Sequence, residues 1–384
     1  YRRGGALEIE ENMSQTITLE GSLKTVHQDE IADLDAALRG STSQIGDPGY
    51  DDARIIWNAM VNRHPGMVVH AIGASDVQRA VKFARTHNLM MSIKSGGHQI
   101  AGHAVVEGAL LLDLSAMNSV SVDPLTKTAR VEPGALLGDV DKETQAHSLI
   151  VPLGINSTTG IAGLTLGGGF GWTTRKFGMT IDNLISAEVV LANGDIVTCD
   201  ATQNSDLFWA LRGGGGNFGV VTAFSFKLHA LGPEVMSGLI VHPISEAPKL
   251  LAKMRTITDT APDELTVWSV MRKAPPLPFL PEEWHGKEVL IFAACYAGDM
   301  VEGEQAMAGL RALGDPIVDV VSPHPFTGWQ AAFDPLLTPG ERNYWKSHDF
   351  AELPDDAISE LLAAIGNLPD PQCEVFIAHV GGAM

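Results

Sequence analysis

Two glycine-rich turns constrain the fold of this chain more than any other feature of its sequence. The first is Lys94-Ser-Gly-Gly-His-Gln-Ile-Ala-Gly102, the second extends from Pro152 to Gly171, and apolar strand-like runs flank both. Because glycine has no Cβ atom, the backbone N–H groups of such turns can approach an anion closely. Two of them in one domain predict a large phosphorylated ligand with His98 beside it.

The charge of the chain restricts its partners. It carries 46 acidic and 26 basic residues, a net charge of −20, which repels the phosphates of nucleic acids and of anionic membranes. No stretch approaches the roughly 20 apolar residues of a membrane span. We therefore expect a small-molecule partner, no nucleic acid and no membrane, and phosphates held mainly by backbone amides.

The cysteines give no sign of a disulfide framework or a metal site. Cys199, Cys295 and Cys373 lie far apart and form no CxxC pair, so neither disulfides nor structural zinc are predicted. A cytoplasmic location is the simplest expectation. Monomer and homodimer both remain open.

At 384 residues the chain is too long for one hydrophobic core, so two domains are expected. The pattern of elements changes near Leu231-Gly-Pro233. We predict an α+β fold with an N-terminal extension at 1–46, a ligand-binding domain at 47–232, and a second domain at 233–384 built on an antiparallel sheet flanked by helices. Met13 resembles a natural start, and an end directly after a strand suggests a truncated C-terminal segment.

The periodicity of apolar residues places individual elements. Asn193-Gly194 predicts a hairpin between strands at 187–191 and 196–198, because Asn-Gly favours the tight turns of hairpins. In the second domain, strands are predicted at 238–241, 265–271, 289–296, 343–350 and 373–380, and helices at 246–258, 301–313 and 355–365.

Several common motifs are missing. The glycines from Gly167 to Gly171 lack the spacing of a dinucleotide-binding turn, and Gly286-Lys287 is followed by Glu288 and so forms no P-loop. No GxSxG nucleophile motif and no HExxH zinc motif is present. A nicotinamide cofactor is therefore disfavoured.

Three motifs in order, Ser95-Gly-Gly-His98, Gly160–Gly169 and Trp209–Val221, resemble the FAD-linked oxidases of the vanillyl-alcohol oxidase superfamily. Within that superfamily the sequence resembles the berberine-bridge-enzyme-like and 6-hydroxynicotine-oxidase-like group, and the resemblance covers residues 47–384. It implies a PCMH-type FAD-binding domain of two α+β subdomains, with the pyrophosphate between the two glycine turns. It also implies a substrate domain over the isoalloxazine ring.

The resemblance assigns roles to residues of the turns. His98 stands where the family histidine is joined to the flavin 8α-methyl carbon. Asn156 stands where many relatives carry a second, cysteine tether, and Cys199 is too far along to replace it, so a single covalent bond through His98 is expected. The residues predicted to bind FAD are Lys94, Ser95, Gly96, Gly97, His98, Gln99, Gly102, Asn156, Ser157, Thr158, Thr159, Gly160, Gly163, Gly167, Gly168, Gly219 and Val221.

The catalytic residues are predicted from the second domain. A strand at 343–350 would place Tyr344, Lys346 and His348 on one face. Tyr344 or Lys346 would accept the substrate proton as hydride leaves for flavin N5, and His379 would line the same cavity. A half-exposed edge strand without a catalytic role is the alternative.

These expectations describe an FAD-dependent oxidase of a small molecule. It would oxidise a CH–OH or CH–NH group and pass electrons to O2, giving H2O2. A dehydrogenase of the same fold with another acceptor is one alternative. The other is a flavin-binding module without turnover, since relatives continue past the His-x-Gly-Gly strand. The sequence does not name the substrate.

Overall fold

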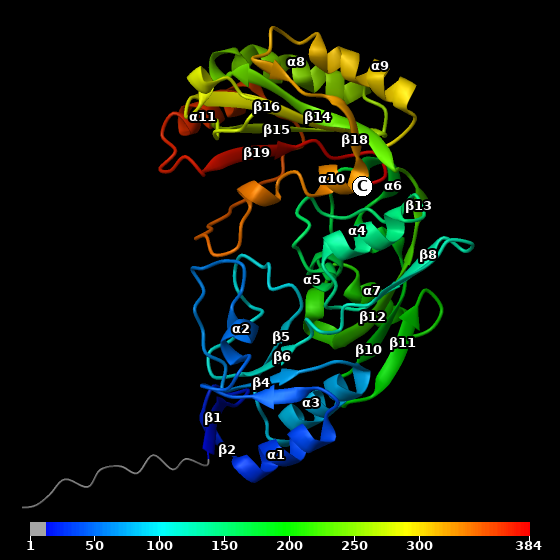
Figure 1. Ribbon diagram of the computed structural model, residues 1–384, viewed down its shortest axis with the longest axis vertical. Helices are drawn as coiled ribbons and strands as arrows, with labels where there is room; N and C mark the ends of the chain where they lie inside the picture. The colour runs from blue at the N-terminus through cyan, green and yellow to red at the C-terminus, as the bar shows by residue number, and fades with distance from the viewer. Residues whose placement is uncertain (1–12) are drawn as a thin grey trace, which may run out of the picture.

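The computed structural model describes residues 13–384 and contains three main sheets stacked along its long axis (Figure 1). The first sheet has the order β3-β4-β6-β5. Its strands are β3 (Ser41–Ser43), β4 (Met67–His70), β5 (Met91–Lys94) and β6 (Leu110–Asp113). β6 runs parallel to β4 and β5, whereas β3 is antiparallel to β4. The parallel arrangement brings the C-terminal ends of β5 and β6 to one edge.

Helices cover both faces of this sheet. α1 (Gln28–Ala37) and α3 (Ala74–Thr86) pack their apolar residues on one face, and α2 (Tyr50–Arg54) packs Tyr50 against Val68 and Leu111 on the other. A hairpin of β1 (Met13–Ile17) and β2 (Leu23–His27) precedes α1.

The predicted boundary after residue 46 is wrong for the part of the extension that is described. β3 is a strand of the first sheet, and Val26, Ile31 and Leu34 belong to its hydrophobic core. Residues 13–46 are therefore an integral part of the first domain. The remainder of the predicted extension, 1–12, lies outside the described residues.

The second sheet is antiparallel, with the order β11-β10-β12-β8-β7. Its strands are β7 (Val120–Asp123), β8 (Thr128–Val131), β10 (Leu184–Val190), β11 (Ile196–Asp200) and β12 (Val220–Lys227), and its helices are α4 (Leu137–Gln145), α5 (Ile161–Leu166), α6 (Thr174–Phe177) and α7 (Ser205–Leu211). β9 (Leu149–Ile150) pairs with β13 (His229–Ala230) to one side. The hairpin predicted at Asn193-Gly194 is confirmed by the pairing of β10 with β11.

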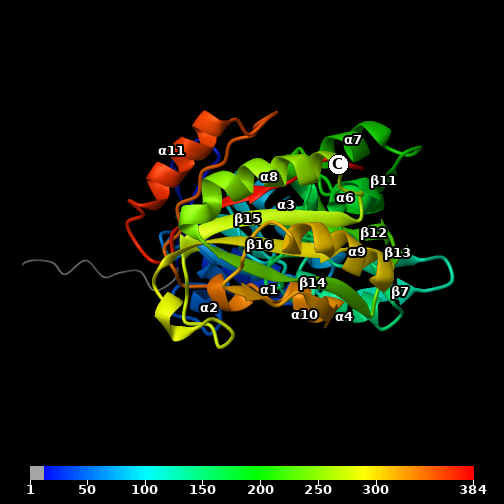
Figure 2. The ribbon, with the colours of Figure 1, turned by 90° about the horizontal axis from the view of Figure 1, so that it is seen from above.

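The third sheet is antiparallel and forms the core of the second domain, in the order β17-β14-β16-β15-β19, with β18 also paired to β14. Its strands are β14 (Glu234–Pro243), β15 (Leu265–Lys273), β16 (Glu288–Tyr296), β17 (Val318–Asp319), β18 (Ser322–Pro325) and β19 (Glu374–Ala378). Its outer face is covered by α8 (Ala247–Thr260), α9 (Met300–Arg311) and α11 (Asp355–Ile365) (Figure 2). The predicted α+β class is thus confirmed.

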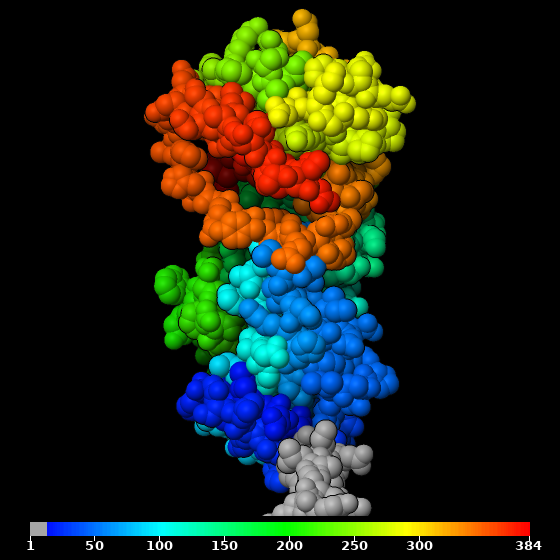
Figure 3. Space-filling model, turned by 90° about the vertical axis from the view of Figure 1, so that its left-hand side faces the viewer, coloured from blue at the N-terminus to red at the C-terminus, as the bar shows by residue number. Residues whose placement is uncertain are grey.

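The segment after β18 returns to the first domain. It contains α10 (Phe326–Gln330) and η5 (Asp334–Leu336), drawn in orange between the two domains in Figure 3. It lies between the apolar inner face of the third sheet and the first domain, where residues of the second glycine turn also reach the sheet.

The strand predicted at 343–350 is wrong, because these residues are irregular and almost all exposed. Strand β15 already pairs with β16 on one side and with β19 on the other. Both alternating faces of 343–350 carry polar side chains, so neither offers a continuous apolar surface to bury. Among the described residues, no helix has the length and apolar character needed to cross a bilayer.

Candidate functional site

The two glycine turns meet at Gly96 and Gly160. A Cβ atom added to Gly96 would lie 2.5 Å from the backbone nitrogen of Gly160, and one added to Gly160 would collide with the nitrogen of Gly96. Only glycine at both positions permits this approach of backbone to backbone. The first turn follows β5 and the second leads into α5, so two subdomains contribute one turn each. The structure therefore brings the predicted turns together.

Side chains of the first turn support its backbone. Lys94 Nζ donates a hydrogen bond of 2.6 Å to the carbonyl of Ala53, and Ser95 Oγ donates one of 2.5 Å to the carbonyl of Pro133. Gln99 Oε1 accepts a hydrogen bond from the backbone of His103. Lys94, Ser95 and the Gln99 oxygen are thus engaged with protein groups, which leaves the backbone N–H groups and the Gln99 amide as donors that the turn offers to an anion.

His98 has an unpaired nitrogen at the centre of the site. Its ring stacks on Trp57, with centroids 4.4 Å apart, and its Nε2 is buried without a hydrogen-bond partner among the described residues. Burial lowers the pKa of His98, so the imidazole is neutral near pH 7. A buried polar atom without a partner costs about 1–3 kcal/mol. This cost indicates that a ligand completes the environment of His98.

The second turn is organised by Asn156. Its Oδ1 accepts a 2.9 Å hydrogen bond from the backbone of Thr158, and its Nδ2 donates one of 3.3 Å to the carbonyl of Leu337. Ser157 donates from its backbone nitrogen, at 2.9 Å, and from its hydroxyl to the carboxylate of Asp334. Two predicted donors, Ser157 and Thr158, thus have protein partners.

Asp334 was missed by the sequence reasoning, since it lies 177 positions from Ser157 in the chain and belongs to no motif. It shows that the amide of Ser157 can hold a carboxylate. The Thr159 backbone is used within the turn, where its nitrogen donates to the carbonyl of Asn156 and its carbonyl accepts from Leu137.

The more distant predicted residues are explained by packing. Gly168 and Gly219 have φ values of +113° and +148°, which favour glycine, and they lie against Met179 and Val190. Val221 is buried in β12 and pairs with Val189. A Cβ atom added to Gly163 would meet no atom within 4 Å, so among these four residues Gly163 has open space beside it in which a ligand could lie.

The segment that carries Tyr344 and Lys346 lies beside Trp57, the residue that stacks on His98, although the predicted strand is absent. Asn58 fixes the start of the segment through two 2.9 Å hydrogen bonds with the backbone of Asn343. Trp345, two residues further on, meets Trp57 edge to face with centroids 5.8 Å apart, and Trp57 stacks on His98. Lys346 Nζ lies 5.3 Å from the centre of the Tyr344 ring, and Tyr344 is 75% exposed.

His379 lies elsewhere, at the end of β19. Its Nε2 is 3.2 Å from Arg175 Nη1. Burial and the charge of Arg175 lower the pKa of His379 to about 4. Its neutral ring accepts the Arg175 hydrogen bond, and it does not line the cavity described next.

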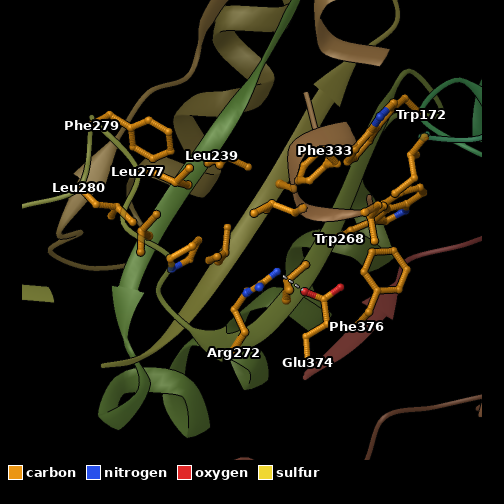
Figure 4. Close-up of a pocket in the computed structure, with 18 residues that line it drawn as sticks. Trp172, Leu239, Trp268, Arg272, Leu277, Phe279, Leu280, Phe333, Glu374 and Phe376 are labelled. Carbon is orange, nitrogen blue, oxygen red and sulfur yellow. Dashed lines mark hydrogen bonds and ion pairs between the residues drawn. The ribbon is translucent and has the colours of Figure 1, made fainter. Parts of the chain in front are cut away.

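A cavity lies on the inner face of the third sheet, lined by 18 residues (Figure 4). Ile155 of the second glycine turn and Leu337 form part of its wall. The carbonyl of Leu337 accepts hydrogen bonds from Trp57 and Asn156, so the cavity adjoins the surroundings of His98. Sequence reasoning missed it. The signal that could have revealed the cavity was Arg272, a charged residue within the otherwise mostly apolar strand β15.

A buried acid–amide contact joins the two domains beside this site. Gln330 Nε2 of α10 donates 3.2 Å to Asp141 Oδ2 of α4 and 3.3 Å to the carbonyl of Gly154. Burial raises the pKa of Asp141 to about 7. Within residues 13–384 no cluster of three or more His, Cys, Asp or Glu side chains could hold a metal ion.

Comparison with known proteins agrees with this geometry. A model of the FAD binding domain matches residues 65–200. An FAD-linked oxidoreductase of Dictyostelium discoideum is 33% identical over 329 residues, which is 85% of this chain and 69% of the relative. The chain thus spans about two thirds of the length of that relative.

Solved structures show the same fold. The crystal structure of 6-hydroxy-D-nicotine oxidase from Arthrobacter nicotinovorans superposes with a TM-score of 0.71 at 29% identity, covering 77% of this chain and 64% of that one. The xylooligosaccharide oxidase of Myceliophthora thermophila in complex with xylobiose gives a TM-score of 0.76 at 26% identity, covering 92% and 76%.

Proposed function

This chain belongs to the family of FAD-linked oxidoreductases, and on that premise we propose that it is an oxidase of a small molecule. It would oxidise a CH–OH or CH–NH group, with O2 as the electron acceptor and H2O2 as the product. The contact of the two glycine turns beside the unpaired nitrogen of His98 carries the proposal. When bound, FAD supplies hydride acceptance and electron transfer to O2.

The residues of the site fit FAD. The approach of Gly96 to Gly160 brings the backbones of the two turns together without a side chain from either glycine, which suits a diphosphate. A chain with a net charge of −20 provides few cations for this purpose, so amide donors of both turns would hold the phosphates. The ammonium group of Lys94 is not expected to bind the phosphates, because it donates a hydrogen bond to the carbonyl of Ala53.

We propose a single covalent tether through His98. A neutral imidazole with a free nitrogen is nucleophilic, and Asn156 has no thiol with which to form a second bond. After acid denaturation, the flavin is expected to remain with the wild-type chain and with His103→Ala, a substitution in the same turn. It is expected to separate from the His98→Ala chain. Retention by His98→Ala would exclude the tether.

Tyr344 and Lys346 remain the proposed sources of the catalytic base, because their segment is fixed beside Trp57. Loss of a general base lowers a rate by roughly 10²–10⁴-fold. Tyr344→Phe or Lys346→Met is expected to slow anaerobic flavin reduction by such a factor, with Lys273→Met as a control outside the segment. A rate unchanged in both variants would assign the base elsewhere. His379, with its lowered pKa, is the weaker candidate.

The electron acceptor separates the oxidase from a dehydrogenase of the same fold. An oxidase in air yields one molecule of H2O2 for each substrate oxidised. A dehydrogenase yields little peroxide but reduces an artificial acceptor. Measurement of the peroxide-to-product ratio therefore decides between them.

A further inference from the structure

The cavity on the third sheet is almost free of polar groups. Of its 18 lining residues, only Arg272 and Glu374 carry polar side chains, if the indole nitrogens of Trp172 and Trp268 are set aside. Trp172 and Trp268 stack with centroids 4.1 Å apart, and Phe376 meets Trp268 edge to face at 4.9 Å. Figure 4 shows these rings on one side of the cavity and Leu277, Phe279 and Leu280 on the other.

Such walls are unsuited to a saccharide. Each hydroxyl group that is buried without a hydrogen-bond partner costs about 1–3 kcal/mol, and a disaccharide carries many hydroxyls. A flat apolar or aromatic molecule would instead bury its faces against Trp268 and Phe376. The shape and chemistry of the walls thus favour an aromatic substrate.

The two charges form a pair with unused hydrogen-bonding capacity. Arg272 of β15 lies opposite Glu374 of β19 in register, and Arg272 Nη1 is 2.6 Å from Glu374 Oε2. The Arg272 Nε contacts the carbonyl of Lys273 at 3.4 Å. Within the described residues, Arg272 Nη2 and Glu374 Oε1 make no hydrogen bond to a side chain or to the backbone, and the Glu374 side chain is partly exposed whereas that of Arg272 is almost buried.

The pair therefore presents one donor and one acceptor side by side while its net charge is zero. A ligand group that accepts from Arg272 and donates to Glu374 satisfies both. A charged ligand group would be attracted to one partner and repelled by the other, and it would lose part of its hydration against the apolar walls. An uncharged hydroxyl or ring amide meets these requirements.

We propose that the substrate is an uncharged aromatic molecule whose hydroxyl or ring amide binds Arg272 and Glu374 together, and that this pair determines specificity. The proposal rests on the proposed oxidase function for the identity of the reaction, but the binding it describes can be measured without turnover. Arg272 and Glu374 act as positioning residues, since they hold one end of the molecule.

The test measures dissociation constants by titration calorimetry, without air, on flavin-loaded enzyme whose flavin has been reduced beforehand with dithionite, so that no probe is oxidised during the titration. The probes are 4-hydroxybenzyl alcohol, its methyl ether 4-methoxybenzyl alcohol, 4-(hydroxymethyl)benzoate and xylobiose. We expect the hydroxyl probe to bind roughly tenfold more tightly than the methyl ether, as expected for one hydrogen bond to a charged group. Xylobiose and the benzoate are expected to bind more weakly still.

Glu374→Gln provides the second measurement, because it leaves the Arg272 charge unbalanced while preserving the size of the side chain. We expect the benzoate to become the preferred probe in this variant. Glu283→Gln, the same substitution at an exposed position, should keep the wild-type order. Because a merely structural ion pair would not change the order of ligands, this reversal is specific to the proposal.

Equal binding of the hydroxyl probe and its methyl ether, tightest binding of xylobiose, or an unchanged order in a folded Glu374→Gln protein would each overturn the proposal. If the variant does not fold, the wild-type comparison of the two alcohols still decides. Binding in the expected order without any flavin reduction would contradict the oxidase function alone. Oxidation of saccharides only would contradict the substrate class alone.

Discussion

Residue size controls the meeting of the two glycine turns. The sequence predicted both turns and the histidine beside them, because glycine clusters and a flanking histidine form a local pattern. It did not predict which glycines touch, since Gly96 and Gly160 approach only after two subdomains have folded. It also did not predict that Lys94 and Ser95 would be used to support the turn.

Gly96→Ala is expected to weaken FAD binding strongly. Its Cβ would lie 2.5 Å from the nitrogen of Gly160, so the turns must separate, at about 1–3 kcal/mol of stability. The measurement is the FAD content of the purified protein together with its unfolding free energy. Gly309→Ala is the matched control, because its Cβ meets open space in helix α9. Normal FAD content in Gly96→Ala would contradict a ligand at this contact.

At the scale of elements, the local sequence pattern predicted several helices and strands, but it could not predict segments whose conformation depends on tertiary contacts. The helix predicted at 355–365 coincides with α11, and the strand predicted at 265–271 lies within β15, since both have strong periodicity. The strand predicted at 343–350 failed. Its residues are held by Asn58 and Trp57 of the first domain, which no local pattern reveals. The cavity on β15 and β19 was hidden for the same reason.

The contact of α4 with α10 predicts a pH-dependent stability. The folded pKa of Asp141, about 7, lies above the ordinary aspartate value of 3.8, so the folded state binds more protons between these values. Below pH 3.8, Asp141 is protonated in both states and does not lower the free energy of unfolding. Between pH 3.8 and about 7 the free energy of unfolding decreases as pH rises, and above pH 7 this group changes it no further.

Asp141→Asn removes this dependence and keeps an amide that can donate to Gln330 Oε1, an atom without a partner in the described structure. Relative to wild type, the variant is expected to gain roughly 1.4 kcal/mol per pH unit across the window between the two pKa values, before levelling above pH 7. Urea unfolding at pH 5, 6 and 8 measures the difference. A constant difference across this range would show that Asp141 is charged in the fold.

At the scale of the whole molecule, contacts between distant segments assemble the site. Trp57 donates to the carbonyl of Leu337, 280 positions away, and Asn58 binds Asn343, 285 positions away. Figure 3 shows the orange segment that carries these residues between the two domains. The α+β fold followed from periodicity, whereas this bridging segment required the folded structure.

Asn58→Ala is expected to release the segment around Tyr344. It removes both hydrogen bonds to the backbone of Asn343, a loss of about 0.5–1.5 kcal/mol for each bond. Trypsin should then cleave faster after Arg342 and Lys346 than in wild type. Asn62→Ala, an exposed asparagine of the same loop, serves as the control. Unchanged cleavage would mean that Trp345 and the backbone hydrogen bonds of Gly340 and Glu341 hold the segment without Asn58.

The claim that this chain oxidises a small molecule with FAD is tested most directly by anaerobic mixing. The purified protein is mixed without air with 4-hydroxybenzyl alcohol and with a panel of other alcohols, amines and saccharides, while the flavin absorbance is followed. We predict that an aromatic alcohol or amine bleaches the flavin and that admitting air restores the colour with release of H2O2. A protein that binds FAD but is bleached by no member of the panel would contradict the account.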